Sequence, residues 1–160
     1  MKKILKWFFL LIAVAFIAIQ FFGPAKTNPP VDAAKTIQAN TQMPPEIAAI
    51  ITRSCQDCHS HETRWPWYSY VAPASWFLIH HVNDARRHLN FSEWATYTPK
   101  RMNKKLEEMG EEVEVGAMPL KSYLFLHPNA KLSPEEVQAL IAWTSAERQR
   151  LAQTDSLSDK

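Results

Sequence analysis

The hydrophobic and polar positions of the chain form one continuous apolar run near the N-terminus and, after it, several stretches with helical spacing. In these stretches apolar residues recur every three or four positions, which is typical of a helix that buries one face. The chain has only three glycines, so few turns of positive φ are available and a hairpin-rich β fold is disfavoured. The pattern therefore predicts an all-α fold, with helices over residues 44–53, 73–89, 99–109 and from Ser133 onward.

The segment around Ser133 carries the clearest signals for a helix start. Ser133 is expected to be the N-cap, Pro134 the first helical residue, and Glu136 the residue that completes a capping box. Gly110 is expected to end the helix before it, because glycine commonly follows a last helical turn. The acidic residues at 107–114 are therefore expected to form a solvated loop, or else a docking patch for a basic redox partner.

The apolar run predicts a membrane segment. Residues 1–6 contain three lysines, and residues 7–22 are apolar apart from Gln20, as in an export signal. Extended by the apolar residues among the lysines, the run would span about 28 Å at 1.5 Å per residue, close to the thickness of a hydrocarbon core. Bulky phenylalanines end it in place of a small-x-small cleavage site, so we expect an uncleaved signal anchor rather than a cleaved signal peptide.

These features define the expected organisation of the chain. Lysines favour the cytoplasmic side of a bacterial inner membrane, so the tip at 1–6 would be cytoplasmic, the helix at 7–22 transmembrane and the rest periplasmic. A polar, proline-containing linker would follow at 23–42, then one domain at 43–150 and a polar tail at 151–160. The net charge of +2 gives no electrostatic case for nucleic acid as a partner.

Both cysteines of the chain lie in the sequence Cys55-Gln56-Asp57-Cys58-His59. This C-x-x-C-H pattern is the attachment signature of c-type haem. Two intervening residues hold the thiols far enough apart to add to the two vinyl groups of one porphyrin, and the adjacent imidazole can then bind the iron. The motif thus predicts one covalent haem c, bound by Cys55 and Cys58, with His59 as the proximal iron ligand.

Two other interpretations of the motif stay open. A C-x-x-C pair can be a thiol–disulfide centre, although such pairs normally begin a helix in a βαβ unit, whereas this one follows a predicted helix. A zinc site could use Cys55, Cys58, His59 and His61, but these ligands are close together in sequence and structural zinc sites usually draw on two separated segments. His61 is also a poor second ligand for a haem iron, because it is tethered to the same side as His59.

The iron has a second axial position, opposite His59, and the candidates for it are Met102, Met109, Met118, His61, His80, His81, His88 and His127. Met118 precedes Pro119, which favours an extended backbone and suits a loop residue that reaches over a flat cofactor. Met102 and Met109 share the apolar face of a helix with Leu106 and are expected to pack there. We therefore expect Met118 as the distal ligand; the alternatives are a histidine ligand and a Met118 that only fills a gap in the core.

Two further groups of residues are expected near the haem. The haem propionates need donors, and the available arginines are Arg64, Arg86 and Arg87. An aromatic stripe follows the motif and is expected to pack as core around the cofactor: Trp65, Trp67, Tyr68 and Tyr70.

Several short segments resemble a known family. They are residues 55–68, 72–76 and 89–94, Met118-Pro119, Tyr123, His127-Pro128 and a closing Leu-Ser-x-x-Glu helix through Trp143. Over about residues 43–148 they resemble the bacterial haem-binding domain family, which is related to monohaem cytochrome c. The resemblance implies a cytochrome c-like helical domain that wraps one covalent haem, with its first and last helices crossing near the haem edge. It also implies His59 and Met118 as iron ligands, and it implies no substrate.

The sequence therefore predicts a membrane-anchored c-type cytochrome that carries single electrons on the periplasmic side. It would not be an enzyme, and its partner would be an unidentified redox protein. One alternative is a haem-based sensor or small-ligand-binding module in which the distal ligand is displaceable. A haem peroxidase ranks last, because the sequence offers no evident distal acid–base pair.

Overall fold

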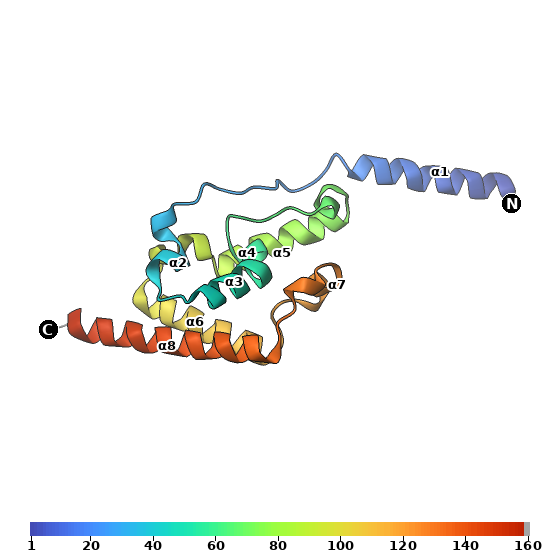
Figure 1. Cartoon of the computed structure of the whole chain (residues 1–160). Coiled ribbons are helices and arrows are strands. Elements are labelled where there is room, and N and C mark those ends of the chain that lie inside the picture. Colours follow the sequence, from blue (N-terminus) through green and yellow to red (C-terminus); the bar gives the residue numbers. More distant parts are fainter. Residues whose placement is uncertain (159–160) are drawn as a thin grey trace.

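The computed structural model describes residues 1–158, over which the chain forms α-helices and short 3-10 helices without a β-strand (Figure 1). The all-α prediction is confirmed. The α-helices are α1 (Lys2–Ile19), α2 (Ile37–Asn40), α3 (Pro45–Ser54), α4 (Gln56–His59), α5 (Ala74–His88), α6 (Pro99–Glu114), α7 (Lys121–Leu126) and α8 (Pro134–Ser158). The 3-10 helices are η1 (Ala33–Lys35), η2 (Trp67–Tyr70), η3 (Phe91–Thr96) and η4 (Pro128–Ala130).

The predicted transmembrane signal anchor at residues 7–22 is wrong. α1 begins at Lys2 and ends at Ile19, so it includes all three N-terminal lysines and excludes the last apolar residues of the run. Its uncharged part, residues 7–19, is about 20 Å long at 1.5 Å per residue, short of a hydrocarbon core of about 30 Å. No helix within residues 1–158 is both long enough and apolar enough to span a bilayer. The predicted placement as a single-pass protein of the bacterial inner membrane is wrong for the same reason.

Two long helices, α6 and α8, lie side by side and run in opposite directions (Figure 1). Gly110 lies inside α6 and does not end it, contrary to the prediction. A Cβ at this position would lie 3.0 Å from Thr144 Oγ1 of α8, so the glycine lets the two helices come close. The helix instead continues to Glu114 and is followed by Gly116, whose φ of +67° favours glycine. The acidic residues predicted as a loop therefore form the last turns of α6.

The predicted start of α8 is confirmed. The backbone N–H of Ser133 donates to Glu136 Oε2 at 2.9 Å, and Ser133 Oγ accepts from the backbone N–H of Glu136 at 3.2 Å. These are the two halves of a capping box. The Glu136 carboxylate also accepts from Arg53 at 2.8 Å, so the cap of α8 is tied to the last turn of α3, directly before the C-x-x-C-H motif.

The hydrophobic core lies where α3, α6, α8 and η3 meet. Trp94, Leu106 and Leu140 are each no more than 1 % exposed there. Ile37 of α2 is fully buried against the same cluster, and α2 packs on η3. Part of the polar segment at 23–42 is therefore packed against the domain.

A buried carboxylate holds the chain where it enters this core. Glu147 of α8 is 3 % exposed, and its Oε1 accepts from the backbone N–H of Gln42 at 3.0 Å. Its Oε2 accepts from Arg150 at 2.8 Å, and Arg150 also donates to the carbonyl of Asn40 at 3.2 Å. Trp143 Nε1 donates to the carbonyl of Gln42 at 3.0 Å. Buried polar groups are costly unless paired, so this network fixes residues 40–42 onto α8.

We expect Glu147→Ala to lower the free energy of unfolding by roughly 2–4 kcal/mol, because it leaves the Gln42 N–H without an acceptor and the Arg150 guanidinium without its carboxylate partner. Chemical denaturation followed by circular dichroism measures the change. Glu111→Ala removes an exposed carboxylate from α6 and is the matched control, with an expected change below about 0.5 kcal/mol. Equal stability of the two variants would contradict the role given to Glu147.

Candidate functional site

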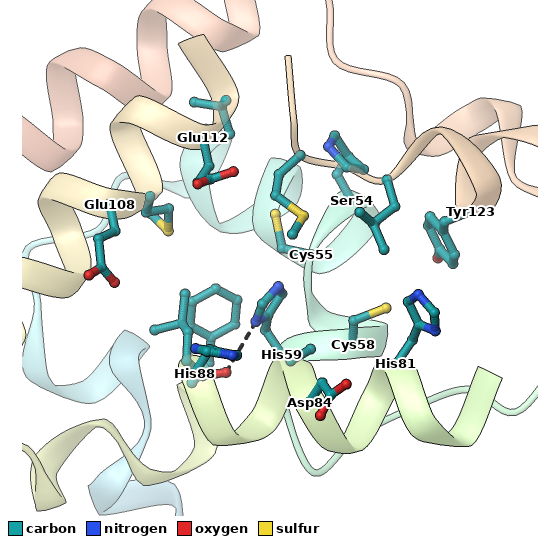
Figure 2. A pocket seen from close by; sticks show the side chains of 18 of the residues that line it. Ser54, Cys55, Cys58, His59, His81, Asp84, His88, Glu108, Glu112 and Tyr123 are labelled. Carbon is teal, nitrogen blue, oxygen red and sulfur yellow. Dashed lines mark hydrogen bonds between the residues drawn. The ribbon is translucent and has the colours of Figure 1, made fainter. Parts of the chain in front are cut away.

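A cavity of about 460 Å³ lies beside the C-x-x-C-H motif, and all four predicted site residues line it: Cys55, Cys58, His59 and Met118. Its walls come from the end of α3, from α4, from the second half of α5, from one face of α6 and from the loop that leads into α7 (Figure 2). The volume falls within the range of about 300–1,000 Å³ that is common for pockets of small molecules and cofactors. The fold thus brings the motif and the predicted distal residue to one space.

The two thiols are positioned by the break between α3 and α4. Cys55 ends α3, and its carbonyl accepts from the backbone N–H of Cys58 at 3.2 Å and of His59 at 3.0 Å, which closes the single turn of α4. Both cysteines are free and half-buried. Burial raises the pKa of Cys55 to about 12 and that of Cys58 to about 11, so both are neutral thiols at neutral pH. They therefore add no charge to the cavity.

The imidazole of His59 has a fixed orientation. Its Nδ1 lies 3.1 Å from the carbonyl oxygen of Leu89, which can only accept, so Nδ1 carries the proton. The other nitrogen, Nε2, is then an unprotonated donor of a lone pair, and Figure 2 shows the ring among the thiols of the cavity. Burial lowers the pKa of His59, which keeps the ring neutral. In a metal-binding histidine, the ring nitrogen that does not bind the metal commonly donates to a backbone carbonyl or a carboxylate.

The loop that carries Met118 is shaped by the end of α6. After Gly116 the chain turns back, and the backbone N–H groups of Ala117 and Met118 both donate to the carbonyl of Glu112, at 2.9 and 3.0 Å. The Met118 side chain is half-buried at the cavity. Met102 does not line the cavity, as predicted, but Met109 does, although the sequence indicated packing for both. Met109 is therefore a second thioether at the site.

The histidines fall into two groups. His81 and His88 of α5 line the cavity, whereas His61, His80 and His127 do not. His61 lies apart because its Nε2 is 2.8 Å from Asn90 Nδ2, so the four residues of the alternative zinc site do not converge. The ring of His81 is held by a hydrogen bond between its Nδ1 and the carbonyl oxygen of Phe77, at 2.9 Å. The sequence alone did not predict which histidines line the cavity, because this depends on which side of α5 packs against the motif.

The arginines expected near the propionates are used elsewhere. Arg86 donates to Ser60, Thr63, Thr27 and Asn28 at 2.7–3.0 Å, which ties the chain before the domain to the loop after the motif. Arg64 pairs with Asp57, and Arg87 pairs with Asp84; neither arginine lines the cavity. Lys105 of α6 does line it, a residue that the sequence did not single out. The sequence did carry one indication of this position: Lys105 precedes Met109 by four residues, which places both side chains on the same face of α6.

The aromatic stripe after the motif is not the wall of the cavity. None of its four residues is among those that line the cavity in the described part of the chain. Trp67 and Tyr70 are exposed, at 77 % and 65 % of their surface. The interpretation of this stripe as core around the cofactor is therefore wrong, because Trp67 and Tyr70 lie one turn apart in the 3-10 helix η2 and share its solvent-exposed side.

A hydrogen-bonded network connects the motif to α7. Asp57 Oδ2 accepts from the hydroxyl of Tyr123 at 3.0 Å, and both carboxylate oxygens accept from Arg64, at 3.0 and 3.1 Å. The Asp57 side chain is 14 % exposed. Burial, together with the charge of Asp57, raises the pKa of Tyr123, so the phenol remains a donor. Tyr123 follows Met118 by five residues. The hydrogen bond between Tyr123 and Asp57 therefore ties the loop that carries Met118 to the C-x-x-C-H motif.

These residues fit a porphyrin. The cavity is large enough for a cofactor, two free thiols with the C-x-x-C spacing line it, and an unprotonated imidazole nitrogen and a thioether are available for iron. A site of this composition belongs to the class of haem-binding proteins.

The comparison with known families leads to the same class. The haem-binding domain model matches residues 14–146, and the chain therefore belongs to the haem-binding domain family. The match includes the motif, Met118 and every residue that lines the cavity. No curated protein and no solved structure matches the chain. Haem is thus the cofactor of this protein.

We expect Tyr123→Phe to lower the free energy of unfolding by about 1–2 kcal/mol, because the charged Asp57 loses one donor while Arg64 stays in place. Thermal or chemical denaturation of the full chain measures the loss. The ring contact with His127, at 4.1 Å between centroids, is kept in this variant. Tyr70→Phe removes an exposed hydroxyl and is the control; a loss as large as in Tyr123→Phe would contradict the network.

Proposed function

We propose that the protein is a c-type cytochrome that holds one haem covalently through Cys55 and Cys58 and transfers single electrons. One observation carries the proposal: two free thiols, the available Nε2 of His59 and the thioether of Met118 line a single cavity. The C-x-x-C-H spacing supports covalent attachment over simple binding, because a haem held only by its iron needs no pair of thiols.

In this proposal His59 is the proximal iron ligand and Met118 the distal one. The Leu89 carbonyl holds the imidazole in the tautomer that can bind, and the Asp57–Tyr123 bond limits the movement of the loop that carries Met118. Bound haem supplies an iron that accepts and releases one electron. A thioether opposite an imidazole favours the ferrous form and so raises the reduction potential.

Two protein ligands would leave no iron position for a substrate, which supports electron transfer without catalysis. The protein therefore needs a donor and an acceptor, and we propose that it exchanges electrons with a redox protein that docks at the exposed side of the cavity. The cavity is partly open and mostly apolar, which suits close approach of a partner.

A second candidate function is favoured by one observation. Met109, His81 and His88 line the same cavity as Met118, so further donor groups are available at the site. A haem whose distal ligand can be exchanged would act as a sensor or as a binder of small ligands. The two functions differ in whether the reduced protein binds carbon monoxide.

We expect the native protein to show the weak long-wavelength band of methionine bound to ferric iron, and no binding of carbon monoxide when reduced. Met118→Leu conserves volume. It should abolish the band, lower the reduction potential and allow carbon monoxide to bind. Absorption spectra of the oxidised and reduced forms test this.

Met102→Leu is the control, since Met102 does not line the cavity, and its spectrum should match that of the native protein. Loss of the band in Met109→Leu but not in Met118→Leu would move the distal ligand to Met109. A native protein without the band, whose spectrum changes in His81→Ala or His88→Ala, would have two histidine ligands. Binding of carbon monoxide by the native protein would favour the sensor.

A further inference from the structure

A haem in this cavity brings two propionates, and their negative charge must be accommodated by the walls or by solvent. Among the described residues that line the cavity, Lys105 is the only lysine or arginine. The arginines at 64, 86 and 87 are held by other partners, as shown above. Three carboxylates already line the same cavity, so further negative charge is unfavourable there without a cation: Asp84, Glu108 and Glu112.

The position of Lys105 follows from the face that α6 turns to the cavity. The residues of α6 on this face have the spacing i, i+3, i+4, i+7 of one helix side, namely Lys105, Glu108, Met109 and Glu112. The Lys105 side chain is only 15 % exposed, whereas the preceding Lys104 is 71 % exposed. A rotation of about 100° around the helix axis thus separates a lysine at the cavity from one in solvent.

The two lysines share one carboxylate. Lys105 Nζ lies 2.6 Å from Glu108 Oε2, and Lys104 Nζ lies 3.7 Å from Glu108 Oε1. If Lys105 turns toward another anion, Glu108 still has Lys104 as a partner. The charge on Glu108 therefore does not have to be left unpaired when Lys105 binds something else.

We propose that Lys105 binds a haem propionate and is the charged anchor of the porphyrin in this protein. The assignment rests on the proposed haem site. The ammonium group donates to the propionate carboxylate, and Lys104 takes over the pairing of Glu108. The thiols would hold the vinyl groups and His59 the iron, and Lys105 would favour a porphyrin that carries free carboxylates.

The test separates the propionates from the rest of the porphyrin. The full-length, haem-free protein is titrated with iron mesoporphyrin, whose ethyl groups cannot form thioethers, and with its dimethyl ester, whose propionates carry no charge. Lys105→Gln should weaken binding of the free acid by about tenfold, as for the loss of one charge-assisted hydrogen bond, and leave binding of the ester unchanged. Lys105→Arg should restore binding of the free acid.

Lys100→Gln is the matched control, because it removes one exposed positive charge from α6 outside the cavity and does not touch Glu108, and it should change neither affinity. In the haem-loaded protein, Lys105→Gln should also lower the reduction potential more than Lys100→Gln, since a positive charge near the haem disfavours the ferric form.

Three results would overturn the assignment. An equal loss for the acid and the ester would show that Lys105 only supports the fold, and an equal loss in Lys100→Gln would show a general effect of surface charge. Unchanged binding of the acid by Lys105→Gln would show that the propionates meet solvent or other donors. Failure of the unsubstituted protein to bind either porphyrin would instead overturn the haem site itself and the assignment with it.

Discussion

The thiols of Cys55 and Cys58 and the imidazole of His59 can face one cavity only while the single turn of α4 keeps its shape. Two backbone N–H groups donate to the Cys55 carbonyl to close that turn, and the Leu89 carbonyl then sets the ring of His59. So short a helix has little stability of its own. The surrounding elements must therefore hold it, and much of the fold can be understood as that support.

The support comes from both sides of the motif. Before it, Arg53 ties the end of α3 to the cap of α8 through Glu136. After it, Asp57 is held by Arg64 and Tyr123, which joins the motif to α7 and limits the loop of Met118. The close contact between α6 and α8 at Gly110 positions α6, which forms another wall of the cavity. The same interactions thus shape the fold and bring the two expected iron ligands to one space.

The sequence predicted the features that local chemistry determines. The C-x-x-C-H spacing and the capping box of Ser133 are read from adjacent residues, and the structure has the cap as expected. The role of Gly110 was missed, because a glycine that ends a helix and one that allows close packing look alike in sequence. Met109 and Lys105 were missed because only the packing of α6 decides which side of it meets the cavity. The apolar run at the N-terminus suggested a membrane span because its lysines were assigned to a separate tip before the helix. In the structure α1 begins at Lys2 and includes them.

The central claim is that the C-x-x-C-H motif holds one haem covalently through thioether bonds. The mass of the purified, unsubstituted protein under denaturing conditions tests it most directly. Denaturation breaks the iron–ligand bonds but leaves thioethers intact. The account predicts a single polypeptide species heavier than the sequence by one haem. A polypeptide of unmodified mass, with haem released as a separate species, would contradict it.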